Sequence, residues 1–191
     1  MKIKEIIQES IQVKEKLLSN KVLLSSIEQA VNVIVECYQE DKKVLFCGNG
    51  GSAADAQHIA AEFSGRFYLN RPPLNAEALH VNSSYLTAVG NDYSFDEIYA
   101  RMVTAAGREG DVLVGISTSG NSKNIIRALE EGKKNGMFTI GFTGEDGGEM
   151  KNLVDLLINV PSSDTPRIQE CHILVGHIIC QYVESILFEK N

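Results

Sequence analysis

The chain has 191 residues, 43% of them hydrophobic and 23% charged, which favours one globular domain over a disordered or fibrous chain. Its net charge of −7 argues against nucleic-acid binding, which needs an excess of basic residues, but it allows an anionic ligand held by local hydrogen-bond donors. The four cysteines form no Cys-x-x-Cys motif, so we expect reduced thiols rather than a disulfide framework or a four-cysteine zinc site.

The sequence also argues against targeting to a membrane. The N-terminus carries charges throughout and lacks the apolar segment of a signal peptide. No apolar run approaches the 18 residues that a membrane span requires. We therefore expect a cytoplasmic protein without membrane contact.

Two amphipathic helices are predicted ahead of any strand. Apolar residues recur at helical spacing over 2–19, and a second helix is expected from a cap at Ser25 or Ser26 to about Gln39. The apolar faces of both helices must be buried, either on the core of the chain or on a partner subunit.

From residue 41 onward, short apolar runs typical of buried strands alternate with helical patterns. The predicted strands span 43–47, 75–81, 111–116, 137–142 and 155–160. The predicted helices span 52–64, 84–89, 93–108, 121–135, 148–153 and 167–190. This alternation predicts an α/β fold: a doubly wound parallel sheet covered by helices on both faces. We expect a single domain over 1–191, with N-terminal helices in 1–40 and the α/β core in 41–191.

Loops at the carboxyl ends of the strands are the expected ligand site of such a sheet. The first, Gly48-Asn-Gly-Gly-Ser52, is similar to a dinucleotide fingerprint, but the acidic residue expected after the second strand is missing. The better interpretation is that Asn49 and backbone N–H groups of this loop face a polyhydroxylated ligand. Residues Asn91 and Asp92 are predicted to lie in a second loop, after a turn at Gly90, or to cap the next helix.

A third loop, between the strand at 111–116 and its helix, is rich in hydroxyl groups. Gly120 permits a tight turn, and the first N–H groups of the helix lack intrahelical partners. One hydroxyl is enough for a helix cap, so four hydroxyls predict a phosphate site. There is no P-loop lysine, which argues against a nucleoside triphosphate. The hydroxyl-bearing residues are Ser117, Thr118, Ser119 and Ser122.

Three histidines lie on predicted helices. His58 and Glu62 are four residues apart and share a helix face, so they form an acid–base pair, a metal site or merely a surface ion pair. The final helix carries Gln169, His172 and His177, and we expect His172 to be packed in the core.

These motifs together resemble the sugar isomerase (SIS) domain family. Within it they are similar to the isomerases that act on seven-carbon sugar phosphates. The segments that carry the resemblance are 48–62, Ser64-Gly-Arg-Phe67, Val89-Gly-Asn-Asp92, 107–122 and Arg167-Ile-Gln-Glu170.

The resemblance implies an SIS-type five-stranded parallel sheet and a homotetramer with its sites at subunit interfaces. The implied reaction interconverts sedoheptulose 7-phosphate and D-glycero-D-manno-heptose 7-phosphate, for bacterial heptose synthesis serving the lipopolysaccharide core or related surface glycans. Phosphate would bind at Ser117, Thr118, Ser119 and Ser122. The sugar would contact Asn49, Gly50, Gly51, Ser52, Asn91, Asp92 and Gln169. Zinc would bind His58, Glu62, Gln169 and His177.

In the implied mechanism, Glu62 is the base and His177 the acid of an enediol isomerisation. The two roles of Glu62 compete, because a metal that stabilises its anion makes it a weaker base. Eight helical residues between Gln169 and His177 rise roughly 12 Å and turn about 80°. We therefore predict that one of these two ligands comes from a neighbouring chain, or that Gln169 lies on an irregular first turn.

Two alternatives to this function remain open. One is a non-catalytic SIS tetramer that binds a replication initiator, which should lack a complete acid–base set; His58, Glu62 and His177 together favour the enzyme. The other is an SIS protein for another sugar phosphate, either an isomerase or a regulator. A regulator should carry a DNA-binding segment, and residues 1–40 are neither basic nor helix-turn-helix in pattern.

Overall fold

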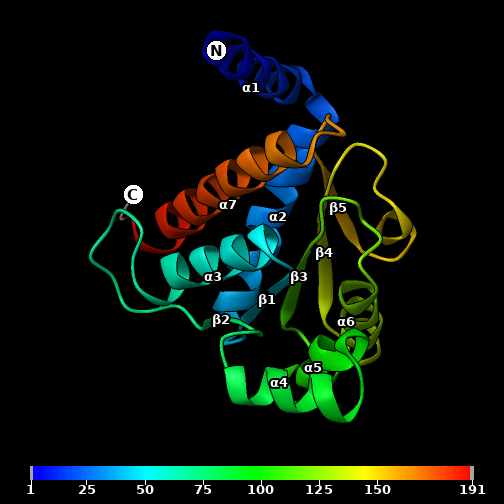
Figure 1. Cartoon of the computed structure of the whole chain (residues 1–191). Helices are drawn as coiled ribbons and strands as arrows, with labels where there is room; N and C mark the ends of the chain where they lie inside the picture. Colours follow the sequence, from blue (N-terminus) through cyan, green and yellow to red (C-terminus); the bar gives the residue numbers. More distant parts are fainter. Residues whose placement is uncertain (1, 190–191) are drawn as a thin grey trace.

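The computed structural model describes residues 2–189 and places a five-stranded sheet between layers of helices (Figure 1). The strands are β1 (Val44–Gly48), β2 (Ala76–Ala78), β3 (Val112–Ile116), β4 (Phe138–Thr143) and β5 (Leu156–Asn159). All pairs are parallel, in the order β2-β1-β3-β4-β5. The chain runs from β1 outward to β2 and then returns to β3 on the other side of β1. The topological switch point therefore lies between β1 and β3, and the predicted doubly wound α/β fold is confirmed.

Helices cover both faces of this sheet (Figure 1). The described helices are α1 (Ile3–Ser19), α2 (Lys21–Gln39), α3 (Gly51–Ser64), α4 (Ser83–Asp92), α5 (Ile98–Ala106), α6 (Lys123–Lys134) and α7 (Thr165–Phe188), with 3-10 turns η1 (Phe95–Glu97) and η2 (Glu149–Asn152). In Figure 1, α2, α3 and α7 lie on one side of the sheet, whereas α4, α5 and α6 lie on the other.

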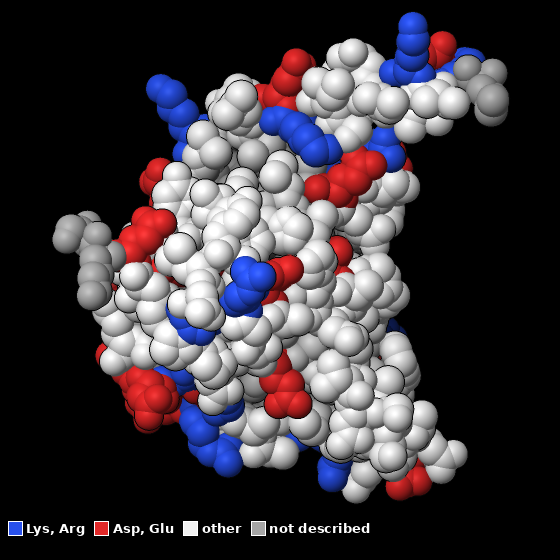
Figure 2. Space-filling model, turned by 90° about the vertical axis from the view of Figure 1, so that its left-hand side faces the viewer, with Lys and Arg blue, Asp and Glu red and all other residues white. Residues whose placement is uncertain are grey.

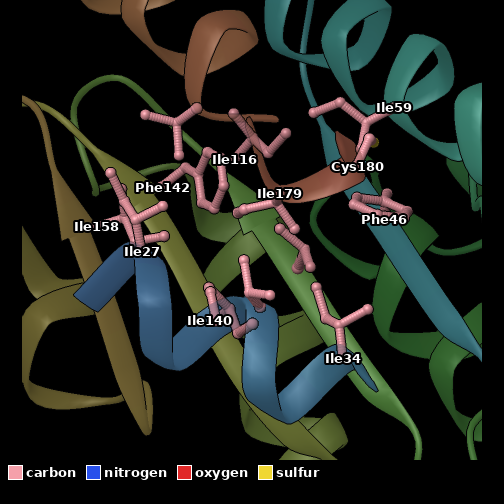
Figure 3. Close-up of a cluster of buried hydrophobic side chains, with 14 of the residues drawn as sticks. Ile27, Ile34, Phe46, Ile59, Ile116, Ile140, Phe142, Ile158, Ile179 and Cys180 are labelled. Carbon is pink, nitrogen blue, oxygen red and sulfur yellow. The ribbon is translucent and has the colours of Figure 1, made fainter. Parts of the chain in front are cut away.

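Alternating strand residues build two separate cores. Phe46 and Ile140 face the layer of α2, α3 and α7, where they meet Ile34 and Ile179 (Figure 3). Their neighbour Leu45 points the other way and joins the core beneath α5 and α6. This follows from the period of two along a strand, which sends successive side chains to opposite faces of the sheet.

Several boundaries differ from the predictions, and the helix predicted over 93–108 is divided into η1 and α5. Helix α2 begins at Lys21, because the side chain of Asn20 accepts a hydrogen bond from the Leu23 N–H at 3.1 Å and caps the helix before Ser25 or Ser26 is reached. Strand β2 has only three residues, since it pairs only with β1 at the sheet edge. Helix α4 continues through Gly90, so Asn91 and Asp92 form its last turn rather than a loop.

Helix α1 is only partly buried by its own chain. It stands at one end of the molecule in Figure 1. Val13 and Leu17 in its second half are buried, but an apolar stripe in its first half stays 43–55% exposed, formed by Ile3, Ile6, Ile7 and Ile11. Of the two burial sites considered for the N-terminal helices, the core of the chain therefore accounts for one face of α2 and for only half of the apolar face of α1.

Helix α7 has the length and apolar composition of a membrane-crossing helix. The same composition suits a core helix, and α7 packs against α2 and α3 with Val175, Ile179 and Val183 buried.

All four cysteines are free and buried, as expected. On the face shown in Figure 2, basic and acidic side chains are interspersed rather than gathered by sign.

His172 is a core histidine, as predicted. It is fully buried, and its Nε2–H donates to the Thr143 carbonyl at 3.1 Å, which leaves Nδ1 unprotonated and without a hydrogen-bond partner. Burial lowers the pKa of His172 from 6.5 to about 4, although its hydrogen bond to Thr143 raises it.

We expect His172 to make stability depend on pH. As the pH falls below 6.5, the unfolded chain binds a proton at this residue while the folded chain does not, so the free energy of unfolding should decrease until about pH 4. The loss should approach about 3 kcal/mol. Urea unfolding at pH 7.5 and pH 5 measures it, and the variant His172→Gln should show a smaller difference. An equal pH dependence in both proteins would contradict this assignment.

Candidate active site

The hydroxyl-rich loop follows β3 at the switch point of the sheet. The Ser117 hydroxyl lies 3.0 Å from that of Ser122 and 3.4 Å from that of Ser119. The Ser122 side chain precedes α6 without capping it, so the first N–H groups of the helix are left for a ligand. Three hydroxyls and a helix N-terminus therefore converge, which is the arrangement that binds phosphate.

This loop packs directly against the loop after β4. Gly120 has φ +66°, and the closest atoms to its missing side chain are the backbone atoms of Gly147 and Gly148. The Gly144 N–H donates to the Thr118 carbonyl at 2.9 Å. The two loops border a cavity of about 270 Å³. Its lining residues are Thr118, Ser119, Asn121, 144–147, Ser162, Ser163, Thr165 and Ile168.

The glycine-rich loop after β1 is held by two residues that sequence reasoning missed. Asn49 and Asn124 exchange two hydrogen bonds of 2.8 Å between their side-chain amides, and Asn124 is 2% exposed. The buried Tyr99 hydroxyl donates to the Gly48 carbonyl at 2.5 Å, and burial raises the pKa of this phenol. Asn124 lies two residues after Ser122, and this nearness to the hydroxyl-rich loop is the only sequence feature that could have indicated its role. No sequence feature indicated the role of Tyr99, because aromatic residues on amphipathic helices are common in any hydrophobic core.

Helix α3 begins beside α7. The Cβ position at Gly51 lies 2.5 Å from Nε2 of Gln169, so only glycine lets this amide approach the loop. Ser52 is buried, and its N–H donates to the Asn49 carbonyl at 3.0 Å. Gly50 has φ +54°, which glycine adopts without strain. The structure therefore brings the predicted residues of 49–52 together with Gln169.

A second cluster lies at the other end of α3. Nε2 of His58 is 3.0 Å from Oε1 of Glu62 and 3.5 Å from Nε2 of His177. Gly176 allows this approach of α7 to α3, because a side chain there would meet Ile59. The ligand atoms of the three residues all lie within 4.8 Å of one another. The predicted pairing of His58 with Glu62 is thus extended by His177 from a distant part of the chain.

These two groups of residues lie far apart within one chain. Glu62 is eleven residues after Gly51, a rise of roughly 16 Å along α3. On α7, Gln169 is beside Gly51 and His177 is beside His58, and the eight residues between Gln169 and His177 rise roughly 12 Å. Helix α7 is regular from Thr165, which excludes an irregular turn at Gln169. That a neighbouring chain supplies one of the ligands remains a prediction.

The remaining predicted residues, Asn91 and Asp92, are exposed at the end of α4. Their side chains share a hydrogen bond of 3.0 Å from Nδ2 of Asn91 to Oδ1 of Asp92.

Asp55, which lies one turn before His58 in α3, was not predicted as a site residue. Burial raises the pKa of its carboxyl, and the charge of His58 partly offsets this.

Comparison with known proteins identifies the family of the chain and several of its relatives. The SIS domain family matches residues 7–144. The phosphoheptose isomerase of Clostridium acetobutylicum is 55% identical over 97% of this chain and 94% of its own length. That of Aneurinibacillus thermoaerophilus is 54% identical over 99% of this chain and 96% of its own length. The solved structure of the phosphoheptose isomerase from Neisseria gonorrhoeae is 46% identical, with a TM-score of 0.90 over 96% of this chain and 97% of that one.

Proposed function

The chain belongs to the SIS domain family and, within it, to the phosphoheptose isomerases, and from this premise we propose how its residues carry the reaction. The reaction interconverts sedoheptulose 7-phosphate and D-glycero-D-manno-heptose 7-phosphate in heptose biosynthesis. The convergence of Glu62 and His177 beside His58 supports the proposal most strongly, because isomerisation needs a base and an acid within reach of adjacent carbons.

In the proposed mechanism, Glu62 removes a proton from C1 of the ketose, and the C–H electron pair becomes the double bond of the enediol. His177 donates a proton to the carbonyl oxygen at C2 in the same half-reaction. In the second half-reaction Glu62 returns its proton to C2. The hydroxyl at C1 then gives its proton to His177 as the aldehyde forms. No proton is gained or lost overall, which is what an isomerase requires.

The phosphate is assigned to the loop of Ser117, Ser119 and Ser122 and the N-terminus of α6, where hydroxyl and N–H donors converge. Contacts to the sugar are assigned to 49–52, to Asn91 and Asp92, and to Gln169. These contacts lie away from the reacting carbons. Their binding energy holds the substrate in position relative to the acid and the base.

The His58 cluster fits a zinc ion. Two imidazole nitrogens and one carboxylate oxygen are zinc ligands by chemistry, and tetrahedral ligands about 2.0–2.1 Å from zinc lie roughly 3.3 Å apart, close to the separations here. We propose that His58, Glu62 and His177 hold zinc, with Gln169 as a further ligand from another subunit. When bound, zinc would polarise the substrate carbonyl as a Lewis acid.

Removal of zinc is expected to lower turnover at least tenfold, because a metal that polarises a carbonyl contributes several kcal/mol to catalysis. Turnover would be measured after treatment with a chelator and again after adding back Zn²⁺, alongside the zinc content of the protein. His58→Asn should lose zinc without losing the fold. Full turnover in protein shown to be free of metal would contradict a catalytic zinc.

We further propose a homotetramer in which each site combines the phosphate loop of one copy with the His58 cluster of another. The rise of roughly 16 Å along α3 from Gly51, in the glycine-rich loop, to Glu62 supports this, because it separates the two groups of residues within one chain. The exposed stripe of α1 and an apolar groove of about 600 Å³ between α2 and α7 offer contact surfaces.

Light scattering should therefore give four times the 21.0 kDa of the chain. The variant Ile7→Glu, on the exposed stripe, should lower this mass and reduce turnover. The control Lys4→Glu changes a charged position of the same helix and should leave both unchanged. A fully active monomer would contradict the shared site.

The proposed function is tested by turnover of sedoheptulose 7-phosphate in D₂O, followed by proton NMR. Product should form with deuterium at carbon, because the proton that Glu62 takes from C1 exchanges with solvent before Glu62 returns a proton to C2. Hexose 6-phosphates should compete weakly. Failure to convert the substrate by protein that is folded, tetrameric and loaded with zinc would overturn the proposal.

We place the enzyme in the cytoplasm, where its four free thiols stay reduced, and assign its product to a surface glycan.

A further inference from the structure

The segment 65–74, which follows α3, is tied to α7 by a buried ion pair. Nε of Arg71 lies 3.6 Å from Oε1 of Glu184, and both side chains are 2% exposed. Glu184 also accepts hydrogen bonds from the backbone N–H groups of Tyr68 at 2.9 Å and Leu69 at 2.6 Å. Buried charges are kept in a fold only when they are paired and hydrogen-bonded, so these contacts define the position of the segment closely.

Arg71 also holds the end of α3. Its guanidinium donates to the Phe63 carbonyl at 2.7 Å and to the Glu62 carbonyl at 2.9 Å. Both carbonyls belong to the last turn of the helix, where no later N–H group of the helix can satisfy them, and where a positive charge is favoured. Arg71 therefore links the turn that carries Glu62 to the helix that carries His177.

Phe67 lies in segment 65–74, and its ring packs against the ring of His177. The centroids of these two rings are 5.6 Å apart, and the centroid of the His58 ring lies 5.0 Å from that of the His177 ring. Glu184 is seven residues after His177, about two turns along the same face of α7. Tyr68 and Leu69, whose N–H groups donate to Glu184, directly follow Phe67 in the chain, so these hydrogen bonds hold the backbone next to the aromatic contact.

We propose that Glu184, Arg71 and Phe67 are positioning residues for the isomerisation. The ion pair holds segment 65–74 in place between α3 and α7. In this position of the segment, the ring of Phe67 packs against the imidazole of His177. This sets the orientation of His177 relative to Glu62. The proposal rests on the role of His177 put forward above. Proton transfer needs hydrogen-bond geometry, and small displacements of an acid are costly, so a rigid support has a direct effect on rate.

The test compares Glu184→Gln and Phe67→Leu with the control Asp111→Asn. Asp111 matches Glu184: it is 1% exposed, accepts backbone N–H bonds from Lys43 and Arg108, and pairs with one cation. It lies before β3, away from the His58 cluster. We expect kcat to fall on the order of tenfold or more in the two test variants, with KM nearly unchanged. The control should lower the unfolding midpoint but keep kcat at temperatures below it.

Phe67 is a half-buried loop residue, so Phe67→Leu decides the matter even if Glu184→Gln does not fold. Phe67→Tyr, which keeps the ring, should restore most of the kcat. If His177→Asn retains wild-type turnover, the proposed mechanism itself is wrong. If His177→Asn is inactive while Phe67→Leu keeps the wild-type kcat, the mechanism stands and only the positioning proposal is overturned.

Discussion

Glu62→Gln is expected to lower kcat by about 10²–10⁴-fold, the usual contribution of a positioned base. The amide keeps the size of the carboxylate but cannot accept the proton from carbon. His177→Asn should cause a loss of similar size, because the enediol would form without a proton donor for the carbonyl oxygen. The two losses should not multiply in the double variant, since residues that act as one unit are not additive.

Turnover and zinc content, measured on the same samples, separate the two proposed roles of Glu62. Loss of turnover with zinc retained would assign Glu62 to proton transfer. Loss of both would assign it chiefly to holding the metal. Glu109→Gln removes an exposed carboxylate in the loop before β3 and should leave turnover unchanged. Wild-type kcat in either Glu62→Gln or His177→Asn would contradict the acid–base pair.

The layered fold was predictable because its signals are local. Buried strands such as 112–116 are continuous apolar runs, and the turn after each one is marked by glycine or hydroxyl residues. Ends of elements were less predictable, since they depend on single side chains. Asn20 caps α2 earlier than the serines would, and α4 tolerates Gly90, where a side chain would meet no atom closer than Ile98 at 4.0 Å.

The candidate site was predictable only in part, for a related reason. Spacing along one helix placed His58 beside Glu62, but the approach of His177 depends on the packing of α7 on α3, which periodicity does not encode. The same holds for Asn124, whose amide pairs with Asn49 across the switch point. Contacts between distant segments arise from tertiary packing. For these contacts the resemblance to a family gave more information than the pattern of residues alone.

Gly120→Ala should disrupt the phosphate loop. Gly120 has φ +66°, a left-handed conformation that costs an L-residue roughly 1–2 kcal/mol. A Cβ atom would also overlap with the backbone of Gly147, which cannot rotate away as a side chain could. We expect the free energy of unfolding to fall by about 2–3 kcal/mol. We also expect KM for the sugar phosphate to rise on the order of tenfold, because displaced hydroxyls weaken binding before and during the reaction alike.

Gly110→Ala provides the matched control. Gly110 has φ +83°, so it carries the same conformational cost, but its Cβ position faces the flexible side chain of Lys42 at 3.2 Å and lies before β3 rather than after it. This variant should lose stability through strain alone and keep its KM. Urea unfolding and initial rates over a range of substrate concentrations measure both quantities. If the two variants showed the same KM, the close contact between 117–122 and 144–148 would not be what shapes the phosphate site. If KM rises only in Gly120→Ala, the packing of one loop on the other sets the affinity for phosphate.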